Sequence, residues 1–153
     1  GRIVTILSAG NDAAKSFTVV GTDVNGAAQT ESITGANAGT ATGTNYFLTI
    51  ASITAVGNPA GNVSAGVNAS AADVIFAGRS RLKGIYLTST ATAGTVDFLN
   101  TSPSGTSILG LSSVGDADAT RDVVIPEEGV LFKTGIYVEY TVSTFLTMTV
   151  FHA

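Results

Sequence analysis

Few side chains in this sequence are suited to catalysis. His152 is the only histidine, it is penultimate among 153 residues, and there is no cysteine. A single histidine needs a nucleophile and an acid to form a triad, or further ligands to form a metal site. The serines do not fall in the Gly-x-Ser-x-Gly pattern of a nucleophile elbow. We therefore expect no enzyme and interpret His152 as part of a frayed or docked terminus.

Acidic side chains form one cluster, in which Asp116, Asp118 and Asp122 are followed by Glu127 and Glu128. Calcium takes six to eight oxygen ligands, and an Asp-x-Asp loop can supply some of them. The Gly and terminal Glu positions of an EF-hand loop are not matched. Solvated loop acids are the default interpretation, and a calcium site is the alternative.

Paired carboxylates could also hydrolyse glycosides, with Asp97, Glu139 or the loop acids as candidates. The sequence does not fix the separation of any two carboxyl groups. The glycines of Gly35 to Gly43 precede neither a helix nor a Lys-Ser/Thr pair, so they do not predict a phosphate loop. We assign no catalytic, metal or cofactor-binding residue, and no cofactor.

The basic residues Arg79, Arg81 and Lys83 alternate and share parity with the apolar residues that follow them. In a regular strand the basic face would run into the apolar face. Either Gly84 marks a bulge or the chain enters the sheet only after it. These three residues, called the basic strip below, are either an exposed segment that precedes the strand or a surface that pairs with an acidic neighbour such as another subunit.

The composition predicts an unusually neutral surface. Charged residues make up 12% of the chain, against about 25% in typical soluble domains. Small polar residues replace them, so close neighbours meet little charge repulsion. A formal charge of −4 argues against nucleic-acid binding. No apolar run is long enough for a membrane helix, and GRIVTILSAG does not resemble a signal peptide, so we expect a soluble, unexported protein without membrane contact.

The elements that would position these side chains are strands, most clearly at the C-terminal end. Residues 136–142 and 145–151 alternate apolar and polar side chains with the period of half-buried strands. The link from Val142 to Phe145 has the length of a hairpin connection. We expect these two strands to pair with each other and close a β-sandwich.

Five further strands are expected in the second half of the chain, with almost no helical signal. Turn residues separate them, as in an antiparallel sandwich of the jelly-roll or Ig-like kind. These strands are residues 82–89, 95–100, 107–111, 122–125 and 130–133.

The first half predicts a β-meander or arm region. Residues 2–8, 15–22 and 28–34 form a three-stranded meander in outline. The small residues of Gly35 to Thr44 are either a flexible loop or a segment threaded against a neighbouring surface. Asn45 to Val56 is one strand crossing two faces, or two strands bent near Ala51.

The small, polar and aperiodic segment from Val63 to Ala72 is the candidate joint between two domains, 1–71 and 72–153. The first carries two basic and three acidic residues, and the second carries five and eight. The first half is therefore the more favourable contact surface, towards a capsid or another subunit.

Four segments resemble small all-β structural proteins of tailed bacteriophages, which serve as capsid decoration, cement, head-fibre or tail components. The segments are ITGANAGTATGT (33–44), GRSRLKGIYLTSTATAGTVDFLN (78–100), VGDADA (114–119) and IPEEGVLFKTGIYV (125–138). The resemblance implies a virion protein in many copies, a homo-oligomer that contacts the major capsid protein or other virion subunits. It supplies no functional residues.

Capsid decoration or cement is our first hypothesis, ahead of a tail or fibre component. A carbohydrate-binding or host-surface-binding sandwich is the alternative. It predicts exposed aromatic side chains, for which Tyr46, Tyr86, Tyr137 and Phe145 are the candidates. A hydrolase is the weakest hypothesis.

Overall fold

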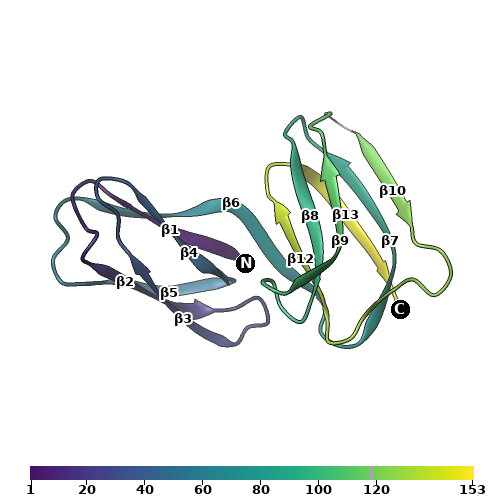
Figure 1. The fold of residues 1–153 in the computed structure, drawn as a ribbon, viewed down its shortest axis with the longest axis horizontal. Coiled ribbons are helices and arrows are strands. Elements are labelled where there is room, and N and C mark those ends of the chain that lie inside the picture. Colours follow the sequence, from purple (N-terminus) through teal and green to yellow (C-terminus); the bar gives the residue numbers. More distant parts are fainter. Residues whose placement is uncertain (118) are drawn as a thin grey trace. The chain divides into compact units, whose positions relative to one another are not determined.

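The structure is a computed structural model that describes residues 1–117 and 119–153. Within those ranges it contains thirteen strands and no helix (Figure 1). The strand pairs whose residue register is known are all antiparallel. This confirms the all-β class and the β-sandwich. The chain divides into two compact units, Gly1–Asn68 and Ala69–Ala153.

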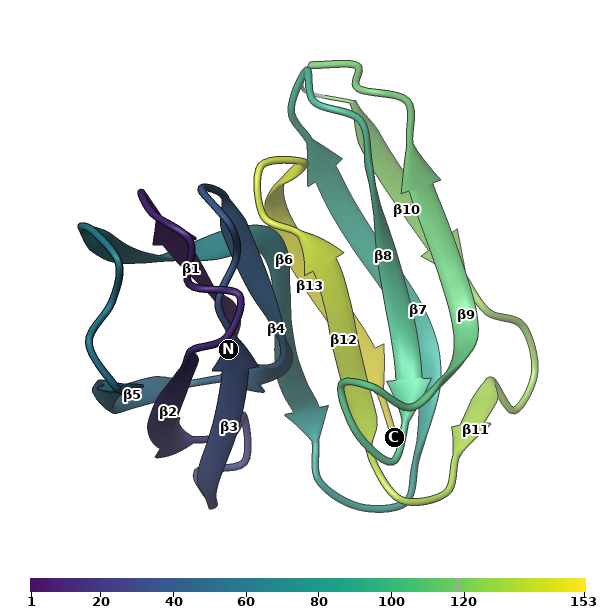
Figure 2. The ribbon, with the colours of Figure 1, turned by 60° about the vertical axis from the view of Figure 1, so that its left-hand side comes forward.

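The first unit contains two small sheets (Figure 2). They enclose a core of apolar side chains. One sheet has the order β4 (Thr40–Phe47), β1 (Arg2–Ser8) and the first part of β6 (Val63–Phe76). The other has the order β3 (Ala28–Thr34), β2 (Ser16–Thr22) and β5 (Thr49–Val56). The buried core of the first unit consists of Val4, Ile6, Phe17, Val19, Ile33 and Phe47.

The predicted meander is wrong, although its three strands lie where the alternation places them. β1 belongs to one sheet, and β2 and β3 pair in the other. The reason lies in the connection between β1 and β2. Asp12 is fully buried there, and its carboxylate accepts a hydrogen bond from the Ala60 amide at 2.7 Å. Its own amide donates to the Ala36 carbonyl at 2.9 Å, so the connection is fixed as a crossing between sheets.

The small-residue segment from Gly35 to Thr44 is not a flexible loop. From Thr40 it forms β4, which pairs with β1 of the same unit. β4 and β5 are separate strands whose break falls at Leu48, not near Ala51. The Leu48 amide donates to the Thr22 carbonyl at 2.8 Å, which fixes the chain as it passes between the sheets.

The Glu31 carboxylate joins β3 to β4. It accepts hydrogen bonds from the Thr44 amide at 2.6 Å, the Thr44 hydroxyl at 2.9 Å and the Asn45 amide at 3.3 Å. Hydrogen bonds to an ionised acceptor are stronger than neutral ones. Because β3 and β4 belong to different sheets, this carboxylate links the two layers of the unit.

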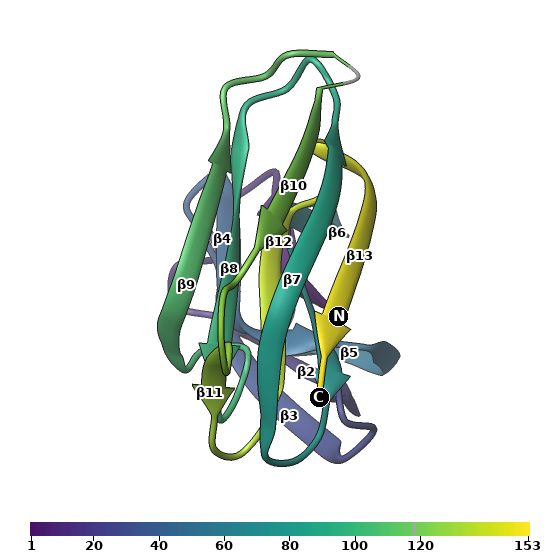
Figure 3. The same cartoon turned by 90° about the vertical axis from the view of Figure 1, so that its right-hand side faces the viewer.

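The second unit is a sandwich of two facing sheets (Figure 3). One sheet has the order β6, β12 (Ile136–Thr141), β8 (Gly94–Asn100) and β9 (Thr106–Ser113). In the other, β7 (Ser80–Ser89) is central. It is flanked by β13 (Phe145–His152), β10 (Thr120–Val124) and β11 (Val130–Phe132).

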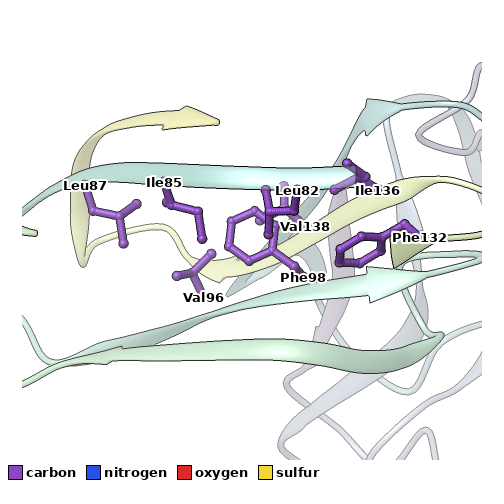
Figure 4. Packing of buried hydrophobic residues seen from close by; sticks show 8 residues of the cluster. All are labelled: Leu82, Ile85, Leu87, Val96, Phe98, Phe132, Ile136 and Val138. Atoms are coloured by element: carbon purple, nitrogen blue, oxygen red, sulfur yellow. The ribbon is translucent and has the colours of Figure 1, made fainter. Parts of the chain in front are cut away.

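The core of the second unit lies between these sheets (Figure 4). Its buried side chains come from β7, β8, β11 and β12, and all seven strands predicted for this half are present as β7 to β13. The core residues are Leu82, Ile85, Leu87, Val96, Phe98, Phe132, Ile136 and Val138.

The predicted pairing of the last two strands is wrong. β12 pairs with β6 and β8, whereas β13 pairs with β7 in the opposite sheet. The short link ends at Thr144, which is fully buried and donates its hydroxyl to the Ala93 carbonyl at 3.1 Å. Its carbonyl accepts the Thr90 amide at 2.7 Å. These bonds hold the link across the end of the sandwich instead of closing a hairpin.

The segment from Val63 to Ala72 is strand throughout, since it forms most of the 14-residue β6. The division between the units falls inside this strand, after Asn68. Ala71 and Ala72 are buried, and both pair with β12. Only these two small residues of the segment are buried, and most of the residues before them are exposed.

Substituting Glu31 tests the link between β3 and β4. Glu31→Ala leaves three donors of β4 without their acceptor, and we expect a loss of about 1–2 kcal/mol in the free energy of unfolding. Glu31→Gln is the matched control, because it keeps one acceptor oxygen without the charge and should lose less. Urea unfolding measures both, and equal losses would contradict the role given to the carboxylate.

Candidate functional site

His152 lies at the end of β13 and is docked. Its Nδ1 is 3.2 Å from the Ser80 hydroxyl, and its ring centroid is 5.1 Å from that of Phe76. The Ser80 hydroxyl also lies 3.0 Å from the Ala153 carbonyl, to which it donates. The Ala153 backbone exchanges two hydrogen bonds with Arg81. The ring and its serine therefore fasten the end of the strand to β7.

The acidic cluster is spread along the chain. Asp122 lies on β10 opposite Tyr86, and Glu127 and Glu128 lie in the loop before β11. Asp118 lies outside the described residues. Among the residues that the structure does describe, no three His, Asp or Glu side chains gather as a metal site would require.

Asp97 and Glu139 are brought together, which the sequence could not show. They are directly opposite each other on β8 and β12, so their side chains share one face of the sheet. Asp97 accepts a hydrogen bond from the Ser107 hydroxyl at 2.8 Å. The apolar groove of this unit is lined by neither carboxylate. The pair is thus a feature of a sheet face and not of a cleft.

The basic strip is held by its own chain. Of the two alternatives for this region, the structure shows the bulge: β13 pairs Phe151 with Gly84 and His152 with Leu82, which leaves Lys83, next to Gly84, as the extra residue. Entry into the sheet only after Gly84 is wrong, because β7 begins at Ser80. Arg81 lies 4.0 Å from the Glu128 carboxylate, and Lys83 donates to the Glu127 carbonyl at 3.1 Å. Two of the three cations therefore contact the loop of residues 127–129.

The four candidate aromatic residues do not form one exposed face. Tyr46 and Tyr137 are only 6% and 7% exposed, and Phe145 is partly buried against the core. Tyr86 is 40% exposed on the outer face of β7, between Asp122 and Thr149. Of the four candidates, only Tyr86 is exposed enough for its ring to stack on a sugar.

The second unit has an apolar groove of about 250 Å³. It lies where β13 faces β6 and β12, and one charged residue, Asp73, lines it. The remaining lining residues are Ile75, Val138, Tyr140, Phe145, Leu146, Thr147 and Met148. The sequence named Phe145 alone among these as a candidate, because the groove exists only once β13 crosses to the opposite sheet.

The first unit has a similar groove of about 270 Å³ between its own two sheets. Its lining is entirely apolar and comprises Ile6, Phe17, Ile53, Ala55, Pro59, Val63 and Ala65. Neither groove presents the convergent polar groups that orient a small-molecule substrate.

β13 combines a free edge with exposed apolar side chains. Among the described strands it pairs only with β7. Leu146 and Phe151 are 59% and 53% exposed, and residues 145–151 include no ionisable side chain. Apolar exposure along an uncharged edge is a feature of interaction surfaces.

Comparison of the chain with protein-family models, curated proteins and solved structures gave no match. None of the described residues belongs to a helix long and apolar enough to cross a membrane.

The exposed contacts of the basic strip predict a small contribution to the free energy of unfolding. Arg81→Met should lower the free energy of unfolding by less than about 1 kcal/mol, because Glu128 is 83% exposed and water competes for the ion pair. Gly129→Ala, in the same loop, should cost about 1–3 kcal/mol, since Gly129 has φ +75° and an added Cβ would lie 2.4 Å from the Leu82 carbonyl oxygen. Urea unfolding compares the two, and equal losses would show that the strip holds the loop more firmly than its geometry indicates.

Proposed function

We propose that this chain is a noncatalytic structural protein of a bacteriophage virion, which decorates or cements the capsid through repeated contacts between subunits. The observation that carries the proposal is the uncharged edge of β13, with Leu146 and Phe151 exposed beside an open apolar groove. The resemblance of four segments to phage structural proteins supplies the setting.

The side chains that could take part in catalysis make structural contacts instead, which supports this function. His152 fastens the end of β13, Arg81 and Lys83 hold a loop, and Asp97 accepts a hydrogen bond from Ser107. Each of these side chains has a structural contact within its own unit. The same groups would have to be free and convergent to act on a substrate.

The surface chemistry supports repeated packing. Only 12% of the residues are charged, so copies that lie side by side on a shell meet little electrostatic repulsion. Exposed strand faces and edges give many weak contacts, which symmetry multiplies. Burying Leu146 and Phe151 at such contacts would also remove them from water, which is favourable.

Binding to isolated capsids tests the proposal. The purified chain should sediment with capsids that lack their decoration protein, at a fixed ratio to the major capsid protein, and light scattering should show a defined small oligomer before addition. Serum albumin, which should stay in the supernatant, controls for trapping. A monomer that ignores capsids but binds a glycan array through Tyr86 would contradict the proposal and favour the carbohydrate-binding alternative.

A further inference from the structure

β13 is held at both ends and has one edge whose backbone pairs with no described strand. One end is anchored at the buried Thr144, and the other is fastened by the two backbone hydrogen bonds between Ala153 and Arg81. On its other side, no described strand pairs with it. A strand held rigidly at both ends loses little further entropy when another strand adds to it.

The edge also lacks the usual protection against pairing. Edge strands are commonly guarded by a charge, a proline or a covering loop. Residues 145–151 contain neither a charge nor a proline, and five of the seven are apolar (Phe145, Leu146, Met148, Val150 and Phe151). β4 and β5 in the first unit and β9 in the second are uncharged edges too, and β5 also lines a groove, but within the second unit only β13 lies beside one. The β13 side is therefore where an added strand would also cover core side chains.

The alternation along β13 allows it to pair with itself. Met148 and Val150 pack against the core, whereas Thr147, Thr149 and Phe151 are exposed. Directly opposite residues of an antiparallel pair share one face. A two-fold axis through Thr149 places Met148 opposite Val150 of the other copy and Thr147 opposite Phe151. The two core-facing residues beside the axis then meet each other, while Phe145, which also packs against the core, lies opposite Ala153. The central part of the edge is therefore self-complementary.

We propose that β13 pairs antiparallel with β13 of a second copy of this chain, with Thr149 on the two-fold axis. The two sheets then form one continuous sheet through both β7 strands. Each added strand lies beside the groove of the other copy and extends the layer that faces Ile75 and Tyr140. This contact deepens the proposed function, on which it rests for its role in the virion, because it names one of the repeated subunit contacts.

Single-cysteine variants test the register, since the native chain has no cysteine. In Thr149→Cys the two Cα atoms lie about 4.5–5.5 Å apart across the axis, within the range that a disulfide bridges. In Thr147→Cys the two copies are offset by four residues, about 13 Å, which is too far. Ile108→Cys, at an exposed position on the β9 edge, is the matched control. Each variant is oxidised under mild conditions without capsids and analysed on a nonreducing gel.

We expect at least tenfold more covalent dimer from Thr149→Cys than from Thr147→Cys or Ile108→Cys. No dimer from Thr149→Cys, or equal amounts from all three, would overturn the proposal. Thr149→Lys gives a second readout: it should convert the native dimer to a monomer with unchanged far-UV circular dichroism, and a dimer that persists would also overturn it. Failure of this pairing is distinguishable from failure of the proposed function, because capsid co-sedimentation is measured on the native chain.

Discussion

The crossing of the chain at Thr144 is the constraint on which the second unit depends. The side chain of this buried threonine bonds to the Ala93 carbonyl and its main chain to Thr90 and Thr141, at the end of the sandwich. Gly94 has to be glycine for this packing, because a Cβ there would lie 2.0 Å from the Thr144 hydroxyl oxygen. The crossing sends β13 to β7 instead of β12. It thereby leaves one edge of β13 unpaired and opens the groove beside β6.

Several charged side chains are engaged by contacts within their own unit. Arg81 and Lys83 are engaged by the loop before β11, and Glu31 is engaged by β4. What is exposed along residues 145–151 is threonine, leucine and phenylalanine, and His152 is exposed at the end of the strand. Such a surface has little power to orient a substrate, but it can pack against an equally neutral neighbour. Packing between neutral surfaces connects the low charge of the sequence with the proposed structural role.

Much of the local structure could be predicted from the sequence, and the connections could not. Alternation in residues 136–151 located β12 and β13. The parity conflict around Gly84 indicated an irregularity, and the pairing with β13 shows that it is a bulge. A period of two residues, however, does not say which strand is the neighbour. Whether Val142 to Thr144 closes a hairpin or crosses between sheets depends on the hydrogen bonds of Thr144 to residues about fifty positions away. The groove and the meeting of Asp97 with Glu139 follow from those long-range pairings, so no local pattern of residues indicates either.

The free edge of β13 is the proposed contact surface between copies of the chain. Amide hydrogen exchange of the native chain at low and high protein concentration measures this without altering any residue. The account predicts that the β13 amides not bonded to β7 become protected as concentration rises, while those on the free edge of β9 keep their exchange rates. Equal exchange of the β13 amides at both concentrations, or protection confined to β9, would contradict it.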